Sequence, residues 1–103
     1  MYHSQFIYFF FQVPLMYTLA EKIGAEGSRL KNFFADAANR PTSLGKRLKD
    51  VPATINEFGI IFQVMAFFKE MPEAVIINAD VSRKVMFISV IIGTYYLHLI
   101  LLA

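Results

Sequence analysis

The sequence predicts an all-α membrane protein, and three observations favour this fold class. The composition is 56% hydrophobic and only 17% charged, which is more apolar and less charged than ordinary soluble chains are. The stretch 85–103 contains no Asp, Glu, Lys or Arg. Elsewhere the apolar residues recur at helical spacing. We therefore expect membrane-associated helices within one domain.

Residues 1–20 contain no charged side chain and carry an aromatic cluster from Phe6 to Phe11. We expect a transmembrane helix here that is kinked, because Pro14 removes one helical hydrogen bond. Tyr2, Tyr8 and Tyr17 prefer the membrane interface, so a helix in the membrane plane or against a partner is the first alternative. A cleaved signal peptide is the second, although its basic start and small-residue cleavage site are missing.

Residues 21–50 form a basic segment, with seven Lys or Arg against four Asp or Glu, and we expect them to lie outside the membrane. An apolar stripe of Leu30, Phe33, Phe34 and Ala37 predicts an amphipathic helix over 28–38, which Pro41 stops. The densest positive charge follows this helix. We expect these residues to bind an anionic lipid such as cardiolipin, the alternative being a flank that only sets topology: Arg40, Lys46, Arg47 and Lys49.

Residues 51–71 are predicted to hold one helix. Thr54 and Glu57 have the spacing of a capping box, in which the Thr54 side chain bonds the backbone amide of Glu57 and the Glu57 side chain bonds that of Thr54. Phe58–Phe68 then runs without a charge, but eleven residues are too few to cross a bilayer. We expect this helix to lie in the interface or to be buried against a partner.

Residues 72–103 are predicted to form one long helix that starts at Pro72 and contains a transmembrane span over 85–103. At about 1.5 Å per residue this span reaches roughly 28 Å, close to the thickness of the hydrocarbon core. The alternative is the buried core helix of a soluble protein, for which so short a chain offers little room. Ser89 and Gly93 form a small-x-x-x-small pair, which we expect to pack against a helix of a partner chain.

Catalytic chemistry is not expected. His3 and His98 stand apart from any Asp, Glu or Cys at metal-ligand spacing, and the chain has no cysteine. No phosphate-binding loop or nucleophile with a base is apparent. We expect no metal, no other cofactor, no nucleic acid and no small-molecule substrate. His98 is interpreted as a histidine near the far membrane surface, with a proton relay as the alternative.

The expected function is that of a small, non-catalytic accessory subunit of a multi-subunit membrane complex. Its partners would be the other subunits and membrane lipid. We expect an energy-converting complex of the mitochondrial inner membrane, the ATP synthase ahead of a respiratory-chain complex, with the basic segment on the matrix side. The choice of organelle follows the frequency of such subunits and no particular residue. A tail-anchored adaptor for a soluble partner and a small self-associating pore-forming protein are the alternatives.

Overall fold

The computed structural model describes the backbone of residues 2–102 and the side chains of residues 10–102, and these residues form helices without a strand. The helices are α1 (Tyr2–Ala38), α2 (Ser43–Lys49), α3 (Glu57–Glu70), α4 (Ala74–Ile77) and α5 (Ala79–Leu102). The predicted all-α class is confirmed. The expectations for the side chains of Tyr2, His3 and the cluster before Phe10, and for Ala103, lie outside the described residues.

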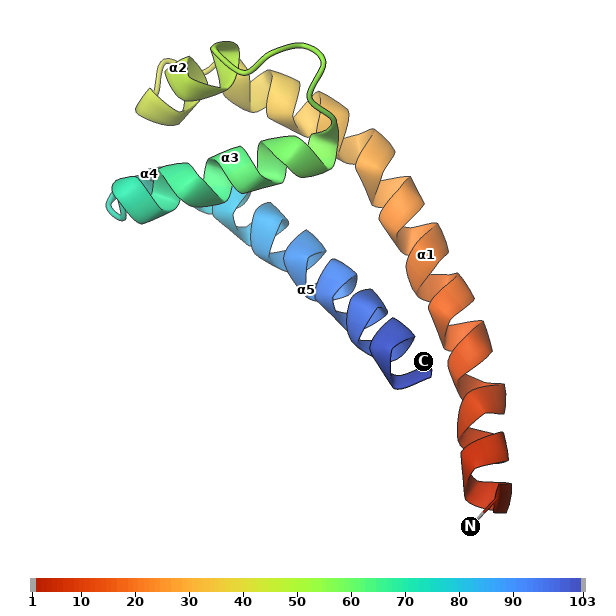
Figure 1. Ribbon diagram of the computed structural model, residues 1–103. Coiled ribbons are helices and arrows are strands. Elements are labelled where there is room, and N and C mark those ends of the chain that lie inside the picture. Colours follow the sequence, from red (N-terminus) through yellow and green to blue (C-terminus); the bar gives the residue numbers. More distant parts are fainter. Residues whose placement is uncertain (1, 103) are drawn as a thin grey trace.

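Two parts of the molecule can be distinguished (Figure 1). In the first, which we call the stem, residues 10–29 of α1 lie beside α5, which runs in the opposite direction. In the second, which we call the cap and which covers residues 30–78, α2 and α3 fold over the end of α1. The molecule is accordingly elongated, with extents of 57 × 24 × 20 Å.

The first helix is longer than expected. The sequence predicts separate helices over 1–20 and 28–38, whereas α1 continues without a break from Tyr2 to Ala38 and contains Pro14. The joining residues are mostly helix formers, and the two glycines among them are tolerated at a modest cost. Figure 1 shows that α1 curves along its length. The predicted end before Pro41 is confirmed.

The core lies in the cap and in the adjoining part of the stem. The apolar stripe predicted for α1 is buried at Leu30, Phe34 and Ala37, while Phe33 is partly buried against it. Side chains of the other helices complete this core: Leu44, Leu48, Ile61, Val64, Phe67, Ala74, Val81, Val85 and Ile88. One continuous core therefore joins the last turns of α1 to α2, α3, α4 and the first half of α5.

The turn between α1 and α2 depends on a glycine. Thr42 caps α2, because its hydroxyl accepts a hydrogen bond from the Gly45 amide at 3.0 Å. A Cβ at Gly45 would collide with the carbonyl oxygen of Arg40 and would lie 3.1 Å from that of Ala37. The backbones of α1 and α2 can approach this closely only because no side chain stands between them.

The start of α3 differs from the predicted capping box. The side chain of Asn56, not Thr54, accepts a hydrogen bond from the Gly59 amide at 2.8 Å, and the helix begins at Glu57. Thr54 lies instead in a turn in which the Ile55 amide bonds the Pro52 carbonyl. Asn and Thr both favour caps, and here the residue nearer the apolar run takes the position.

The predicted long helix from Pro72 is interrupted at Asn78, which separates α4 from α5. The buried Asn78 side chain donates to the Ala74 carbonyl at 3.0 Å, and its backbone carbonyl accepts from the Ser82 amide at 2.9 Å. Asparagine competes in this way with regular helical bonding. The break lets α4 turn away from the direction of α5.

Within residues 2–102, α5 is the one helix that is long and apolar enough to cross a membrane. Its most apolar window has a mean hydropathy of 2.1, yet only 17% of that window is buried inside the molecule. A core helix of a soluble protein would be mostly buried. The apolar surface of α5 is therefore left largely uncovered by the chain itself.

Candidate functional site

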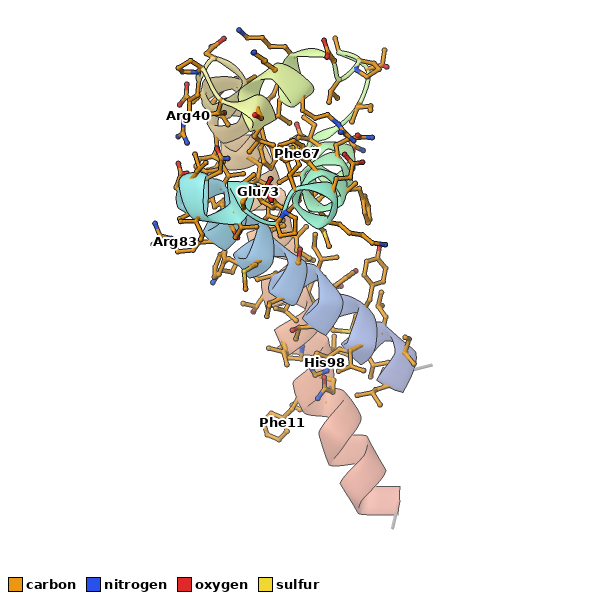
Figure 2. All side chains as sticks on the ribbon, turned by 90° about the vertical axis from the view of Figure 1, so that its left-hand side faces the viewer. Phe11, Arg40, Phe67, Glu73, Arg83 and His98 are labelled. Atoms are coloured by element: carbon orange, nitrogen blue, oxygen red, sulfur yellow. The ribbon has the colours of Figure 1, made fainter. Side chains whose placement is uncertain are left out.

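Charged side chains gather at one end of the molecule. Figure 2 shows Arg40, Glu73 and Arg83 toward the cap, whereas Phe11 and His98 lie toward the other end of the stem. The four basic residues singled out as a lipid site all belong to the cap. The structure divides them into two pairs with different surroundings.

Arg47 joins α2 to α3. Its guanidinium donates two hydrogen bonds to the Glu70 carboxylate, at 2.9 and 3.4 Å, and lies 5.9 Å from the ring centroid of Phe67. The hydrogen bonds and the opposite charge lower the pKa of Glu70 and raise the pKa of Arg47. The bidentate geometry orients this arginine toward the protein.

Arg40 joins the end of α1 to the start of α5. One of its nitrogens lies 2.7 Å from a carboxylate oxygen of Asp80. This hydrogen bond, together with the charge of Asp80, raises the pKa of Arg40. Arg40 and Arg47 thus each neutralise an acid of another helix.

Lys46 and Lys49 remain as exposed bases on α2, and no ion pair reaches either of them within residues 10–102. The predicted set of four is therefore not one free cluster. Its two arginines form ion pairs with acids of other helices, while its two lysines are exposed.

The predicted helix-packing pair, Ser89 and Gly93, lines an open groove of about 490 Å³ between α1, α3 and α5. Within the described part of the chain, a Cβ at Gly93 would meet no atom within 4 Å, so no described helix packs on that position. The remaining walls of the groove are almost entirely apolar: Ile23, Phe58, Ile61, Phe62, Met65, Ile92, Tyr95 and Tyr96.

A buried carboxylate that the sequence interpretation missed lies between α1 and α5. Glu26 is only 6% exposed. Its Oε2 lies 3.2 Å from the Lys84 ammonium, and its Oε1 lies 3.4 Å from the Arg29 guanidinium. Oε2 accepts no hydrogen bond of good geometry. Glu26 precedes Leu30 by one helical turn and therefore lies on the same face of α1 as the apolar stripe.

Farther along the stem, Gln12 and His98 each bury a polar atom that has no hydrogen-bond partner among the described residues, Oε1 and Nδ1 respectively. The register of the two helices brings these residues to the same level. Glu26 meets Lys84, and Lys22 lies 5.2 Å from the ring centroid of Phe87. Continued by fourteen residues along each helix from the Glu26–Lys84 pair, this antiparallel register places Gln12 opposite His98.

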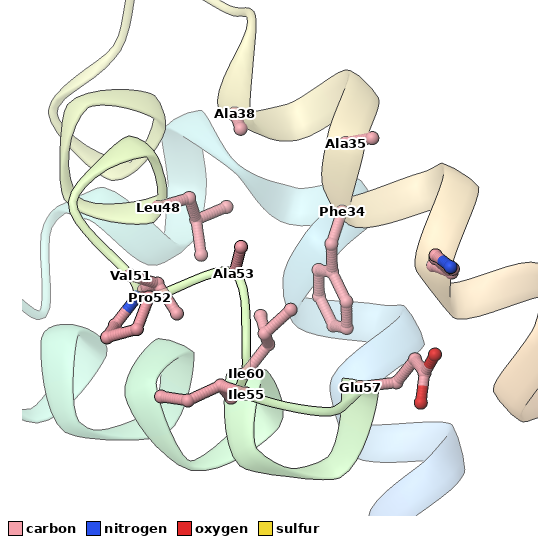
Figure 3. Close-up of a pocket in the computed structure, with 11 residues that line it drawn as sticks. Phe34, Ala35, Ala38, Leu48, Val51, Pro52, Ala53, Ile55, Glu57 and Ile60 are labelled. Atoms are coloured by element: carbon pink, nitrogen blue, oxygen red, sulfur yellow. The ribbon is translucent and has the colours of Figure 1, made fainter.

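A second cavity, of about 290 Å³, lies beneath the loop that joins α2 to α3. Figure 3 shows Phe34, Leu48 and Ile60 around it, with Glu57 toward one side. Lys31 and Glu57 are its charged residues. Neither has a nucleophile or a metal ligand set beside it, so we assign no chemistry to this cavity.

Within the described residues, no group of three His, Cys, Asp or Glu side chains could hold a metal ion. The arrangement offers ion pairs, apolar surface and an open groove, which suit binding and packing. Comparison with known proteins finds no family model, no curated protein and no solved structure that matches this chain. The function must therefore be argued from the residues themselves.

Proposed function

We propose that this protein is a small, non-catalytic accessory subunit of a multi-subunit membrane complex. The observation that carries the proposal is the uncovered apolar surface of α5, of whose most apolar window only 17% is buried within the chain. Such a surface requires lipid or other protein around it. Because residues 10–20 and 85–102 of the stem carry no Asp, Glu, Lys or Arg, the proposal places that part of the stem in the bilayer and the cap at its surface.

The orientation follows from charge. Residues 21–50 carry seven bases and four acids, and positively charged segments stay on the cytoplasmic or matrix side. The exposed Arg83 lies just before the apolar part of α5, where its side chain can reach headgroups, whereas Lys84 is paired with Glu26. Because α1 lies beside α5, the N-terminal part of α1 accompanies α5 across the bilayer and both ends of the chain face the opposite compartment.

Protein partners, in addition to lipid, are favoured by the exposed face of α4. Ile76 is 82% exposed and Ile77 is 71% exposed, although both belong to the charged cap. Neighbouring exposed isoleucines on a short helix are typical of a surface that another protein covers. Within this class we infer an energy-converting complex of the mitochondrial inner membrane, the ATP synthase or a respiratory complex, with the cap on the matrix side.

The test is purification of the tagged chain from its native membrane in mild detergent. The proposal expects the chain in a large complex at fixed stoichiometry with the same subunits. A chain that is recovered mainly free, or bound to one soluble protein, would contradict it and favour the tail-anchored adaptor. Conductance of liposomes that contain the purified chain alone would favour a pore-forming protein.

A variant pair locates the contact. Ile76→Ser with Ile77→Ser removes the exposed apolar side chains, whereas Ala66→Ser makes a matched polar change at an exposed position of α3. We expect the double variant to enter the membrane but to be recovered in the complex at least about fivefold less, since interface anchors contribute more than about 1 kcal/mol. Equal recovery of both variants would assign the α4 face to lipid.

A further inference from the structure

The groove beside Gly93 continues into a further cavity, which is polar. The groove and the polar cavity share Ile23 and Phe58 as common walls. The polar cavity measures about 590 Å³ and lies between the middle of α1 and the start of α3. Its other residues are mostly small or polar: Gly24, Gly27, Ser28, Lys31, Asn32 and Glu57. One continuous depression is thus apolar at one end and polar at the other.

The order of the two ends matches the orientation of a phospholipid. The polar cavity follows α1 from Ile23 toward Asn32, which is the direction of the cap. The apolar groove follows α5 from Ser89 to Tyr96, away from the cap and along the helix that would cross the bilayer. A lipid in this depression would have its headgroup beside the cap and an acyl chain along α5.

The charges at the polar end indicate the kind of headgroup. Lys31 and Glu57 both line the polar cavity and also the cavity beneath the α2–α3 loop, so both side chains border the same depression. No ion pair joins them to each other, or to any other residue of the described part of the chain. A headgroup with one negative and one positive charge would complement both, the phosphate at Lys31 and the ammonium at Glu57. An anionic headgroup such as phosphatidylglycerol has no ammonium group, so Glu57 would be left without a partner of opposite charge.

We propose that this depression is a binding site for a zwitterionic phospholipid of the phosphatidylethanolamine type. Lys31, with Ser28 and Asn32 beside it, holds the phosphate, and Glu57 accepts hydrogen bonds from the primary ammonium. The acyl chain lies in the groove against Gly93, whose missing side chain keeps the groove open. The site is separate from Lys46 and Lys49 and does not require the partner subunits proposed above, although it does rest on the placement of α5 in a bilayer.

The experiment uses the full chain in nanodiscs of phosphatidylcholine. These nanodiscs contain a small fraction of phosphatidylethanolamine or phosphatidylglycerol with a photoreactive diazirine in one acyl chain. After illumination, mass spectrometry of peptides locates and quantifies the adducts. We expect phosphatidylethanolamine adducts on the groove walls, in peptides that contain Phe62 and Met65 or Ile92 and Tyr96, and several-fold fewer with phosphatidylglycerol.

Gly93→Leu places a side chain in the groove at a position where the added Cβ meets no described atom within 4 Å. It should lower groove adducts about fivefold, whereas Val90→Leu, on the exposed outer side of α5, should leave them unchanged. Circular dichroism checks that both variants keep their helix content. Equal groove adducts in both variants would overturn the acyl-chain assignment. Unchanged adducts together with poorer recovery of Gly93→Leu in the native complex would assign the groove to a partner helix.

The headgroup has its own variants. Lys31→Gln should lower the adducts of both phospholipids about fivefold, as expected for the loss of about 1 kcal/mol from one base near a phosphate. Glu57→Gln should remove the preference for phosphatidylethanolamine over phosphatidylglycerol. A preference for phosphatidylglycerol in the unmodified chain, or one that Glu57→Gln does not alter, would overturn the proposal. A chain that does not enter nanodiscs would overturn the bilayer placement, whereas loss of the native complex alone would not touch this site.

Discussion

Replacing Lys84 with methionine should weaken the contact between α1 and α5 by about 3 kcal/mol. The Glu26 carboxylate is 6% exposed and lies 3.2 Å from the Lys84 ammonium. Removing one partner of a buried ion pair costs about 3–5 kcal/mol, because the other charge stays buried without compensation. We expect the lower end of this range, since Lys84 is itself 28% exposed at its side chain and Arg29 still lies 3.4 Å from Glu26.

Two control variants separate this effect from a general loss of charge. Arg29→Met removes a side chain that is 72% exposed, so it should cost less than about 1 kcal/mol, as exposed ion pairs do. The double change Glu26→Gln with Lys84→Met removes both charges. It should therefore be less destabilising than Lys84→Met alone, because no unpaired carboxylate is left in the helix contact.

The absence of cysteine makes the measurement direct. Cysteines introduced at the exposed positions Glu21 and Val90, on neighbouring parts of α1 and α5, can carry spin labels. The fraction of molecules in which the labels have separated is then followed as SDS is added to mild detergent micelles. If Lys84→Met separates the helices no more readily than Arg29→Met does, the buried carboxylate does not hold α1 to α5 and the reasoning is wrong.

Three further predictions concern the cap. Because Arg47 lowers the pKa of Glu70 below its ordinary value of 4.5, the stability from this pair is complete above pH 4.5. It should be lost as the pH falls through the depressed value, and Arg47→Gln should flatten this part of the stability profile in detergent. Gly45→Ala adds a Cβ that collides with a backbone carbonyl at the end of α1, so thermal unfolding should show a loss of about 1–3 kcal/mol. Lys46→Gln with Lys49→Gln should lower co-purified anionic lipid; unchanged lipid content would leave these bases only a role in topology.

The elements that depend on local pattern could be predicted from the sequence. The spacing of Leu30, Phe34 and Ala37 predicts the buried face at the end of α1, and Pro41 predicts where that helix stops. The break at Asn78 was missed, because an asparagine in a helical pattern is compatible both with a helix interior and with a cap. Only tertiary packing around that residue decides between the two.

The surroundings of the candidate site residues could be predicted less well. Arg47 and Glu70 are separated by 23 residues, and no local pattern indicates that they pair. The density of basic residues therefore predicts one free basic cluster, whereas in the structure Arg40 and Arg47 are paired with Asp80 and Glu70. The helical period places Glu26 one turn before Leu30 on the buried face of α1, although its charge is typical of an exposed position. The groove at Gly93 required three helices to be placed in space.

The crossing of a bilayer by α5 is the claim on which the proposed function and the lipid site both depend. It is tested most directly by two single-cysteine chains, Arg83→Cys and Leu101→Cys, both at exposed positions near opposite ends of α5. The two positions are roughly 27 Å apart along a helix, about the thickness of a hydrocarbon core. In sealed native membrane vesicles, a membrane-impermeant maleimide should label one of them from outside and the other only after the vesicles are opened. Labelling of both from the same side in intact vesicles would contradict the account.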